Sequence, residues 1–233
     1  MRQIFLDTET TGLDPRQGHR IIEVAGVEMI NRRLSGNRFH RYLNPERDID
    51  AGALQVHGLS SEFLQDKPRF ADIVDELLAF LQGAELVIHN APFDLGFLNA
   101  ELQRLARSSI AEYCPDVTDT LKLAKDLHPG QKNNLDALCR RYSVDNTSRS
   151  LHGALLDAEL LAAVYLGMTR GQESLAMEVE TVSVLPGLQQ GCRHGPLRVI
   201  LADVQELAAH RAELDRLEQE NRKASLWYDA RAQ

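Results

Sequence analysis

Hydrophobic residues in the first part of the chain follow the short period of strands. Apolar runs over 4–9 and 21–30 and an alternating run over 39–43 are joined by short connections, with turn-forming residues over 31–37. This pattern predicts three strands, each paired with the next in an antiparallel meander.

The middle of the chain changes to the period of a helix. Five apolar residues at helical spacing predict a helix over 71–81, and a short apolar run predicts a buried strand over 86–88. A helix is expected from Pro92 to about Leu105, because proline is favoured in a first turn. The remaining pattern predicts a strand over 117–121 and helices over 135–142 and 153–168. Strands followed by alternating strands and helices indicate an α/β fold with a mixed sheet flanked by helices.

The regular pattern ends near residue 169. Gly, Gln, Ser and Pro residues up to about 196 predict a flexible linker, and a short strand over 197–201 and a charged helix over 203–222 follow. A lone helix of this kind is marginal in water, and the only Trp of the chain, Trp227, lies near the end. Since Trp is a favoured interface anchor, the tail is predicted to dock on another protein.

Composition and charge limit the possible functions. The apolar runs are too short to span a membrane, and the first strand starts too early to leave room for a signal peptide. Three cysteines without a pattern fit a reducing cytoplasm. With a net charge of -8 the chain is a poor general binder of nucleic acid, so such a substrate must be held locally, by metal ions or by a partner.

Two carboxylates interrupt the first apolar run. Asp7 and Glu9 are two residues apart, so on a strand they point to the same face, about 7 Å apart along the backbone. Like charges on a buried face need compensation, and a divalent cation supplies it. The pair alone fits equally well a solvated edge strand.

A third acid and a histidine occur late in the chain. Asp157 shares its helix face with Leu160, Leu161 and Val164, where an apolar residue is expected, although an acid at the margin of the stripe could also reach water. His152, five residues earlier, is predicted to lie in the preceding loop, free to lean over the site as a general base.

Asp94 completes the set. It lies in the first helical turn after the strand over 86–88, where the helix dipole alone would favour an acid, and where open mixed sheets place their ligands. Four carboxylates without cysteine suit Mg²⁺ or Mn²⁺. Two such ions support hydrolysis of a phosphodiester.

Four motifs occur in order over residues 1 to about 170: DTETTGL at 7–13, VHG at 56–58, HNAPFD at 89–94 and LHGALLDA at 151–158. With them the chain resembles 3′–5′ exonucleases of the DEDDh group, and within that group the proofreading epsilon subunits of bacterial DNA polymerase III. The resemblance implies an RNase H-like fold with a mixed five-stranded sheet, and a 3′–5′ exonuclease domain over 1–170.

The resemblance also implies the roles of individual residues. Two divalent cations, Mg²⁺ or Mn²⁺, would be held by Asp7, Glu9, Asp94 and Asp157, and His152 would take a proton from the attacking water. Nucleoside 5′-monophosphates would be released from a single-stranded or frayed 3′ DNA end, which would be contacted by Asp7, Glu9, Thr10, Gly12, His57, Phe93 and Asp157. The chain departs from the family at Gly52, where relatives carry an acid or amide, so a contact from that side chain is absent.

For the tail, the resemblance implies two partners. The expected linker over 171–196 contains a peptide similar to clamp-binding motifs, with Gln172 and Leu175 as contacts for a sliding clamp. The segment over 197–233 would bind the catalytic (alpha) subunit of the polymerase through Leu207, Leu214, Leu217, Leu226 and Trp227. Two alternatives stay open, a stand-alone exoribonuclease with the same acids and a mainly structural subunit of a polymerase assembly.

Overall fold

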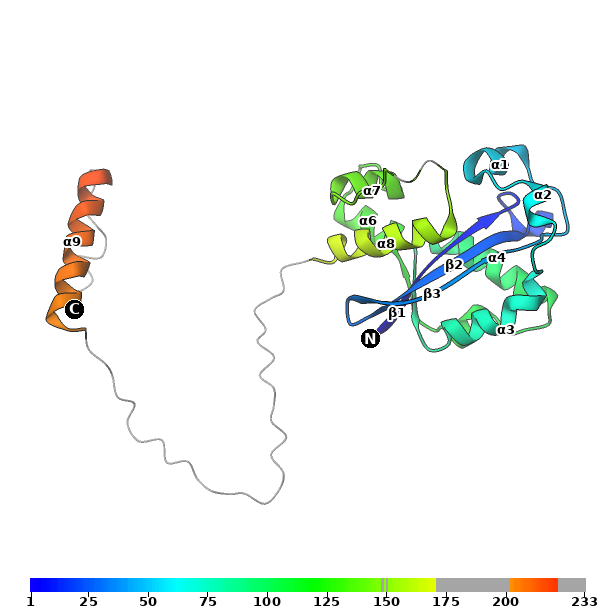
Figure 1. Cartoon of the computed structure of the whole chain (residues 1–233), viewed down its shortest axis with the longest axis horizontal. Coiled ribbons are helices and arrows are strands. Elements are labelled where there is room, and N and C mark those ends of the chain that lie inside the picture. The colour runs from blue at the N-terminus through cyan, green and yellow to red at the C-terminus, as the bar shows by residue number, and fades with distance from the viewer. Residues whose placement is uncertain (148, 150, 171–201, 222–233) are drawn as a thin grey trace, which may run out of the picture. The chain divides into compact units, whose positions relative to one another are not determined.

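The computed structural model describes residues 1–147, 149, 151–170 and 202–221 (Figure 1). These residues fall into two units, with residues up to 170 in the first and 202–221 in the second. Each unit is described by itself.

The first unit is built on one mixed sheet. Strands β1 (Arg2–Thr10), β2 (Ile21–Ile30) and β3 (Arg33–Tyr42) form an antiparallel meander, and β4 (Glu85–Ile88) and β5 (Val117–Asp119) add in parallel. The strand order is β3-β2-β1-β4-β5, so β1 is central. The predicted five-stranded mixed sheet is confirmed, and the reading of β1 as a solvated edge strand is wrong.

Helices cover both faces of the sheet, and β1 contributes to both cores. Ile4 and Leu6 pack with α3 (Phe70–Leu81), α4 (Ala91–Arg104) and α5 (Ile110–Tyr113). Phe5 packs instead with α6 (Thr120–Leu127), α7 (Leu135–Arg141) and α8 (Ala154–Met168), which lie together in Figure 1. Alternate residues of β1 therefore face different helical layers.

Two boundaries differ from the sequence prediction. Asn31 and Arg32 both have positive φ, 48° and 63°, and form a tight turn, so β3 begins at Arg33 inside the predicted turn. Mirror-image hairpin turns of this kind usually contain glycine. The turn at Asn31 and Arg32 contains none, so it could not be recognised from the sequence. The predicted strand over 117–121 ends at Asp119, because the Asp119 carboxylate accepts hydrogen bonds from the backbone of Leu121 and Lys122 and starts α6.

Five helices of the first unit were not predicted: η1 (Pro15–Gln17), α1 (Ala51–His57), α2 (Ser61–Leu64), α5 and α6. All but α6 are at most seven residues long, too short to show a clear helical repeat. Of these, α1 matters for the site, because it ends at His57.

The second unit contains α9 (Val204–Asn221), where a helix was predicted. Leu214 is buried, whereas Leu207 and Leu217 are each 39% exposed. The predicted linker, the strand over 197–201 and the contacts Gln172, Leu175, Leu226 and Trp227 lie outside the described residues. None of the helices in the described ranges is long and apolar enough to cross a membrane.

Candidate active site

The centre of the site is the second half of β1. Parallel pairing with β4 covers only Gln3 to Phe5, so Asp7 and Glu9 extend past the carboxyl end of β4. They follow Phe5 on the face of β1 that α8 covers. Glu9 is only 8% exposed and Asp7 is partly exposed. At this point β1 keeps its antiparallel neighbour β2, whereas its parallel neighbour β4 has ended. The end of β4 leaves room beside both acids for a ligand.

Asp94 reaches the site from the other helical layer. It lies in the first turn of α4, which begins after Asn90 in a left-handed conformation (φ 70°). Thr8, between the two strand acids, donates a hydrogen bond from its Oγ1 to Asp94 Oδ1 at 2.7 Å. Asp94 is buried, and its burial raises its pKa from 3.8 to about 7.

Asp157 projects from the first turn of α8 and is 4% exposed. Ligand atoms of Asp157, Glu9 and His152 all lie within 4.8 Å of one another. Oxygen and nitrogen ligands bind one divalent cation at about 2.0–2.6 Å, so this separation matches ligands around a common ion.

The electrostatics show that the acids need a counter-charge. Burial, followed by the charge of Asp157, raises the pKa of Glu9 from 4.5 to about 8. Burial, followed by the charge of Asp94, raises the pKa of Asp7 well above its usual value. Carboxylates that repel one another in this way are stabilised in their ionised form by a bound cation. The residues present therefore fit the metal site that the motifs imply.

His152 lies in the loop before α8, as predicted. Its backbone N–H donates to the carbonyl of Val56 in α1 at 3.1 Å, and its exposed side chain places Nδ1 3.6 Å from Asp157 Oδ2. Burial, and then the positive charge of Arg149, lower the pKa of His152. The imidazole is therefore neutral near pH 7, as a general base must be.

The predicted substrate contacts lie on neighbouring segments. Thr10 ends β1 and donates a hydrogen bond from its Oγ1 to the carbonyl of Gly12 at 2.7 Å. A Cβ on Gly12 would lie 2.3 Å from His19, so this turn requires glycine. Phe93 precedes Asp94 and packs on Phe97, with ring centroids 5.0 Å apart.

His57 is the buried member of this group. Its Nδ1 accepts a hydrogen bond from the backbone of Leu59 at 3.0 Å, and its Nε2 has no partner among the described residues. Gly52 in the same helix has no heavy atom within 4 Å of the position that a Cβ would take.

Two charged residues of the site were missed from the sequence. Glu23 pairs with Glu9 across β1 and β2, is buried, and contacts His40 Nε2 through its Oε1 at 2.7 Å. Arg149 binds both carboxylate oxygens of Asp157, from Nε at 2.5 Å and from Nη2 at 2.7 Å. The strand register would have identified Glu23, whereas no pattern in the sequence links Arg149 to Asp157.

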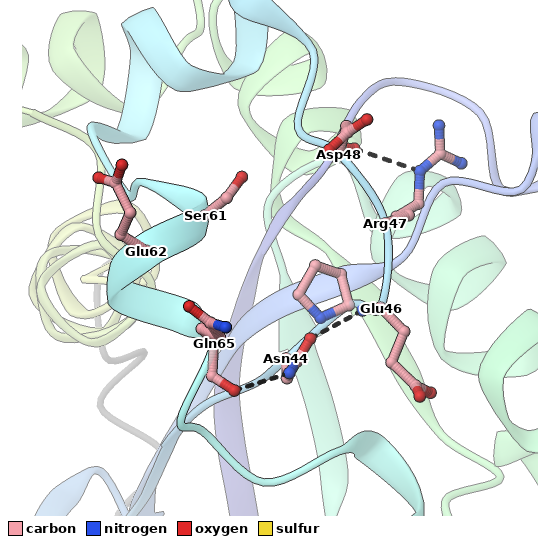
Figure 2. A pocket seen from close by; sticks show the side chains of 8 residues that line it. Asn44, Glu46, Arg47, Asp48, Ser61, Glu62 and Gln65 are labelled. Atoms are coloured by element: carbon pink, nitrogen blue, oxygen red, sulfur yellow. Dashed lines mark hydrogen bonds between the residues drawn. The ribbon is translucent and has the colours of Figure 1, made fainter.

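A separate pocket of about 410 Å³ lies between the loop over 44–48 and α2 (Figure 2). Its wall is polar: Asn44 Nδ2 donates to the carbonyl of Gln65 at 2.9 Å, and Arg47 Nε donates to the carbonyl of Asp48 at 3.3 Å. None of the acids of the site or His152 lines this pocket.

Comparison with known proteins decides the family. The family model described as an exonuclease, RNase_T, matches residues 4–165. The DNA polymerase III subunits epsilon of Salmonella typhimurium and Escherichia coli are 52% and 50% identical, and each match covers 97% of this chain and 97% of the relative. The chain belongs to the DNA polymerase III epsilon family.

This membership confirms the predicted activity, that of a proofreading 3′–5′ exonuclease subunit of DNA polymerase III. A solved structure, exonuclease X in complex with 5′ overhanging duplex DNA, has the same fold (TM-score 0.53, 27% identity, covering 71% of this chain and 90% of that one). The match to epsilon subunits extends past residue 170. It therefore favours a polymerase subunit over a stand-alone exoribonuclease, and the exonuclease family model argues against a purely structural subunit.

Proposed function

We propose that Asp7, Glu9, Asp94 and Asp157 hold two divalent cations, Mg²⁺ or Mn²⁺, at which the 3′-terminal phosphodiester of single-stranded or frayed DNA is hydrolysed to nucleoside 5′-monophosphates. The observation that carries this proposal is that acids from β1, α4 and α8 lie close enough to act on one another. After burial, the charges of Asp94, Glu9 and Asp157 raise the pKa of Asp7, and the pKa of Glu9 is raised to about 8. Cations bound there would activate a water molecule and stabilise the leaving oxygen.

His152 is the general base in this proposal. Its lowered pKa keeps the imidazole able to accept a proton from the attacking water near pH 7. The imidazolium formed would be stabilised by Asp157, whose Oδ2 lies 3.6 Å from His152 Nδ1. The bond from the His152 backbone to Val56 holds the loop in place while the side chain stays exposed to water.

The terminal nucleotide is bounded by Thr10, Gly12, His57 and Phe93. The unpartnered Nε2 of His57 offers a polar contact to the nucleotide, and the half-buried ring of Phe93 offers an apolar face to a base or sugar. None of these contacts needs to read the base. Because unpairing costs less at a mismatch, fraying of the end supplies the selectivity of proofreading.

The tail carries the proposed partner contacts. The segment over 197–233 binds the polymerase catalytic subunit, and Gln172 and Leu175 contact the sliding clamp, in a cytoplasmic replication complex. Two observations support the first contact: the epsilon match covers 97% of this chain and so includes most of this segment, and Leu207 on α9 is 39% exposed. Leu207 therefore offers apolar contact area to a partner on an otherwise charged helix.

The metal assignment is tested with Asp7→Asn and Asp157→Asn in the full chain. Both variants are expected to abolish Mg²⁺-dependent digestion of a 3′-labelled oligonucleotide while circular dichroism shows a folded protein. Asp75→Asn is the matched control, since Asp75 is an exposed acid paired with Arg107 on the surface. Wild-type rates from either site variant would disprove the assignment.

A further inference from the structure

Arg149 is a buried cation inside the acid cluster. Its side chain is 6% exposed, and besides the two bonds to Asp157 it donates from Nη1 to Asp136 Oδ1 at 2.7 Å. Nη2 also lies 3.0 Å from His152 Nδ1. One guanidinium group therefore contacts a predicted metal ligand, the predicted base and an acid outside the site.

We propose that Arg149 competes with a divalent cation for Asp157 and so sets the metal concentration that the site requires. The inference rests on the proposed metal site. Arg149, which is not one of the five residues of the DEDDh motif, would compete with the cation for Asp157 from within the protein.

The contact with Asp157 is strong enough for competition. Arginine stays protonated, and its paired N–H groups match the two oxygens of a carboxylate. With both side chains nearly buried, water screens the pair weakly. A cation that took Asp157 as a ligand would therefore have to displace charge-assisted hydrogen bonds from Arg149.

Asp136 provides the second position for Arg149. It lies on α7 and its side chain is 44% exposed, so it can keep the guanidinium after release from Asp157 without burying a new charge. Arg149 would stay tethered beside the site.

Release of Arg149 from Asp157 also affects the predicted base, His152. The contact from Nη2 to His152 Nδ1 at 3.0 Å occupies a nitrogen lone pair of the imidazole. Moving Arg149 toward Asp136 frees the imidazole. Metal binding and exposure of the base are coupled in this way, because both require the same side chain to leave.

The test is calorimetric titration of the full chain with Mn²⁺ alone, without DNA. Arg149→Gln is expected to bind Mn²⁺ on the order of tenfold more tightly, about 1.4 kcal/mol, since the competitor is gone. Asp136→Asn is expected to bind it severalfold more weakly, because Arg149 then has no second acid. Arg38→Gln is the control, since it removes an exposed arginine that pairs with Glu159 on α8.

Competition predicts opposite changes in Mn²⁺ affinity for Arg149→Gln and Asp136→Asn. Partial loss of folding would instead weaken Mn²⁺ binding in both variants. Thermal unfolding gives a second measurement: Arg149→Gln should melt below wild type without metal and show the larger Mn²⁺-induced increase. Equal or weaker Mn²⁺ binding by Arg149→Gln, or unchanged or tighter binding by Asp136→Asn, would overturn the inference. A wild-type chain that binds no Mn²⁺ would instead refute the metal site itself.

Discussion

Replacing Glu9 with glutamine tests whether the buried acids of the site lower the free energy of unfolding of the metal-free protein. The pKa of Glu9 is raised from 4.5 to about 8 in the folded protein, so between these values the folded chain holds a proton that the unfolded chain releases. Stability then falls as the pH rises through this window. Glutamine has the shape of the protonated acid without the proton uptake.

The size of the stabilisation expected for Glu9→Gln depends on the pH. At pH 7 protonation of a group with an ordinary pKa of 4.5 costs about 3 kcal/mol, at about 1.4 kcal/mol per pH unit. Glu9→Gln should therefore stabilise the metal-free protein by about 3 kcal/mol at pH 7, or roughly 6–12 °C in melting temperature. At pH 5 the gain should shrink to about 1 kcal/mol or less.

The assay is thermal unfolding in chelator at pH 5 and pH 7, repeated with Mn²⁺. Wild type should gain stability from Mn²⁺ at pH 7, and Glu9→Gln should gain little, since it has lost a ligand. Glu159→Gln, an exposed acid on α8, is the control and should show no pH-dependent gain. A Glu9→Gln protein no more stable than wild type at pH 7, or equally stabilised at both pH values, would refute the reasoning.

Three further substitutions test the supports of the site. Thr8→Val removes the hydroxyl that donates to buried Asp94, and should cost about 1–3 kcal/mol in urea unfolding and raise the pKa of Asp94 further. Gly12→Ala places a methyl group 2.3 Å from the His19 ring, and should lower the melting temperature, with part of the loss restored by adding His19→Ala. His152→Ala should slow digestion by about 10²–10⁴-fold and remove the acidic limb of the pH–rate profile, while calorimetry shows Mn²⁺ binding close to wild type. An unchanged pH–rate profile in that variant would argue against the base role.

Strong periodicity made much of the fold predictable. The sequence placed β2 over 21–30 and α3 and α8 within one residue of their observed bounds. The apolar run of β2 is buried on both faces, and the apolar repeats of α3 and α8 bury one face of each helix. It missed α6, whose start depends on the Asp119 cap, and placed β3 late, since the turn at Asn31 and Arg32 contains no glycine. Local side-chain and backbone contacts decided these boundaries, and they leave little trace in a hydrophobic pattern.

The site was predictable where a polar residue broke a pattern. Asp7 and Glu9 interrupt an apolar strand, and Asp157 replaces an apolar residue on a helix stripe, so each is visible as an exception. Glu23 became visible only through the register that pairs it with Glu9. Arg149 comes from a loop without a period, and its contacts with Asp157 and Asp136 depend on how α7 and α8 pack.

The alternation of β1 explains why this strand can assemble a site from both helical layers. Asp7 and Glu9 follow Phe5 on the α8 face, where Asp157 meets Glu9, whereas Thr8 follows Leu6 on the α4 face and holds Asp94. A shift of one residue in β1 would exchange these faces, burying both acids against α4 and turning Thr8 toward Asp157. The apolar residues before the acids therefore do more than fill the core. By fixing the register of β1, they place Glu9 beside Asp157 of α8 and Thr8 beside Asp94 of α4.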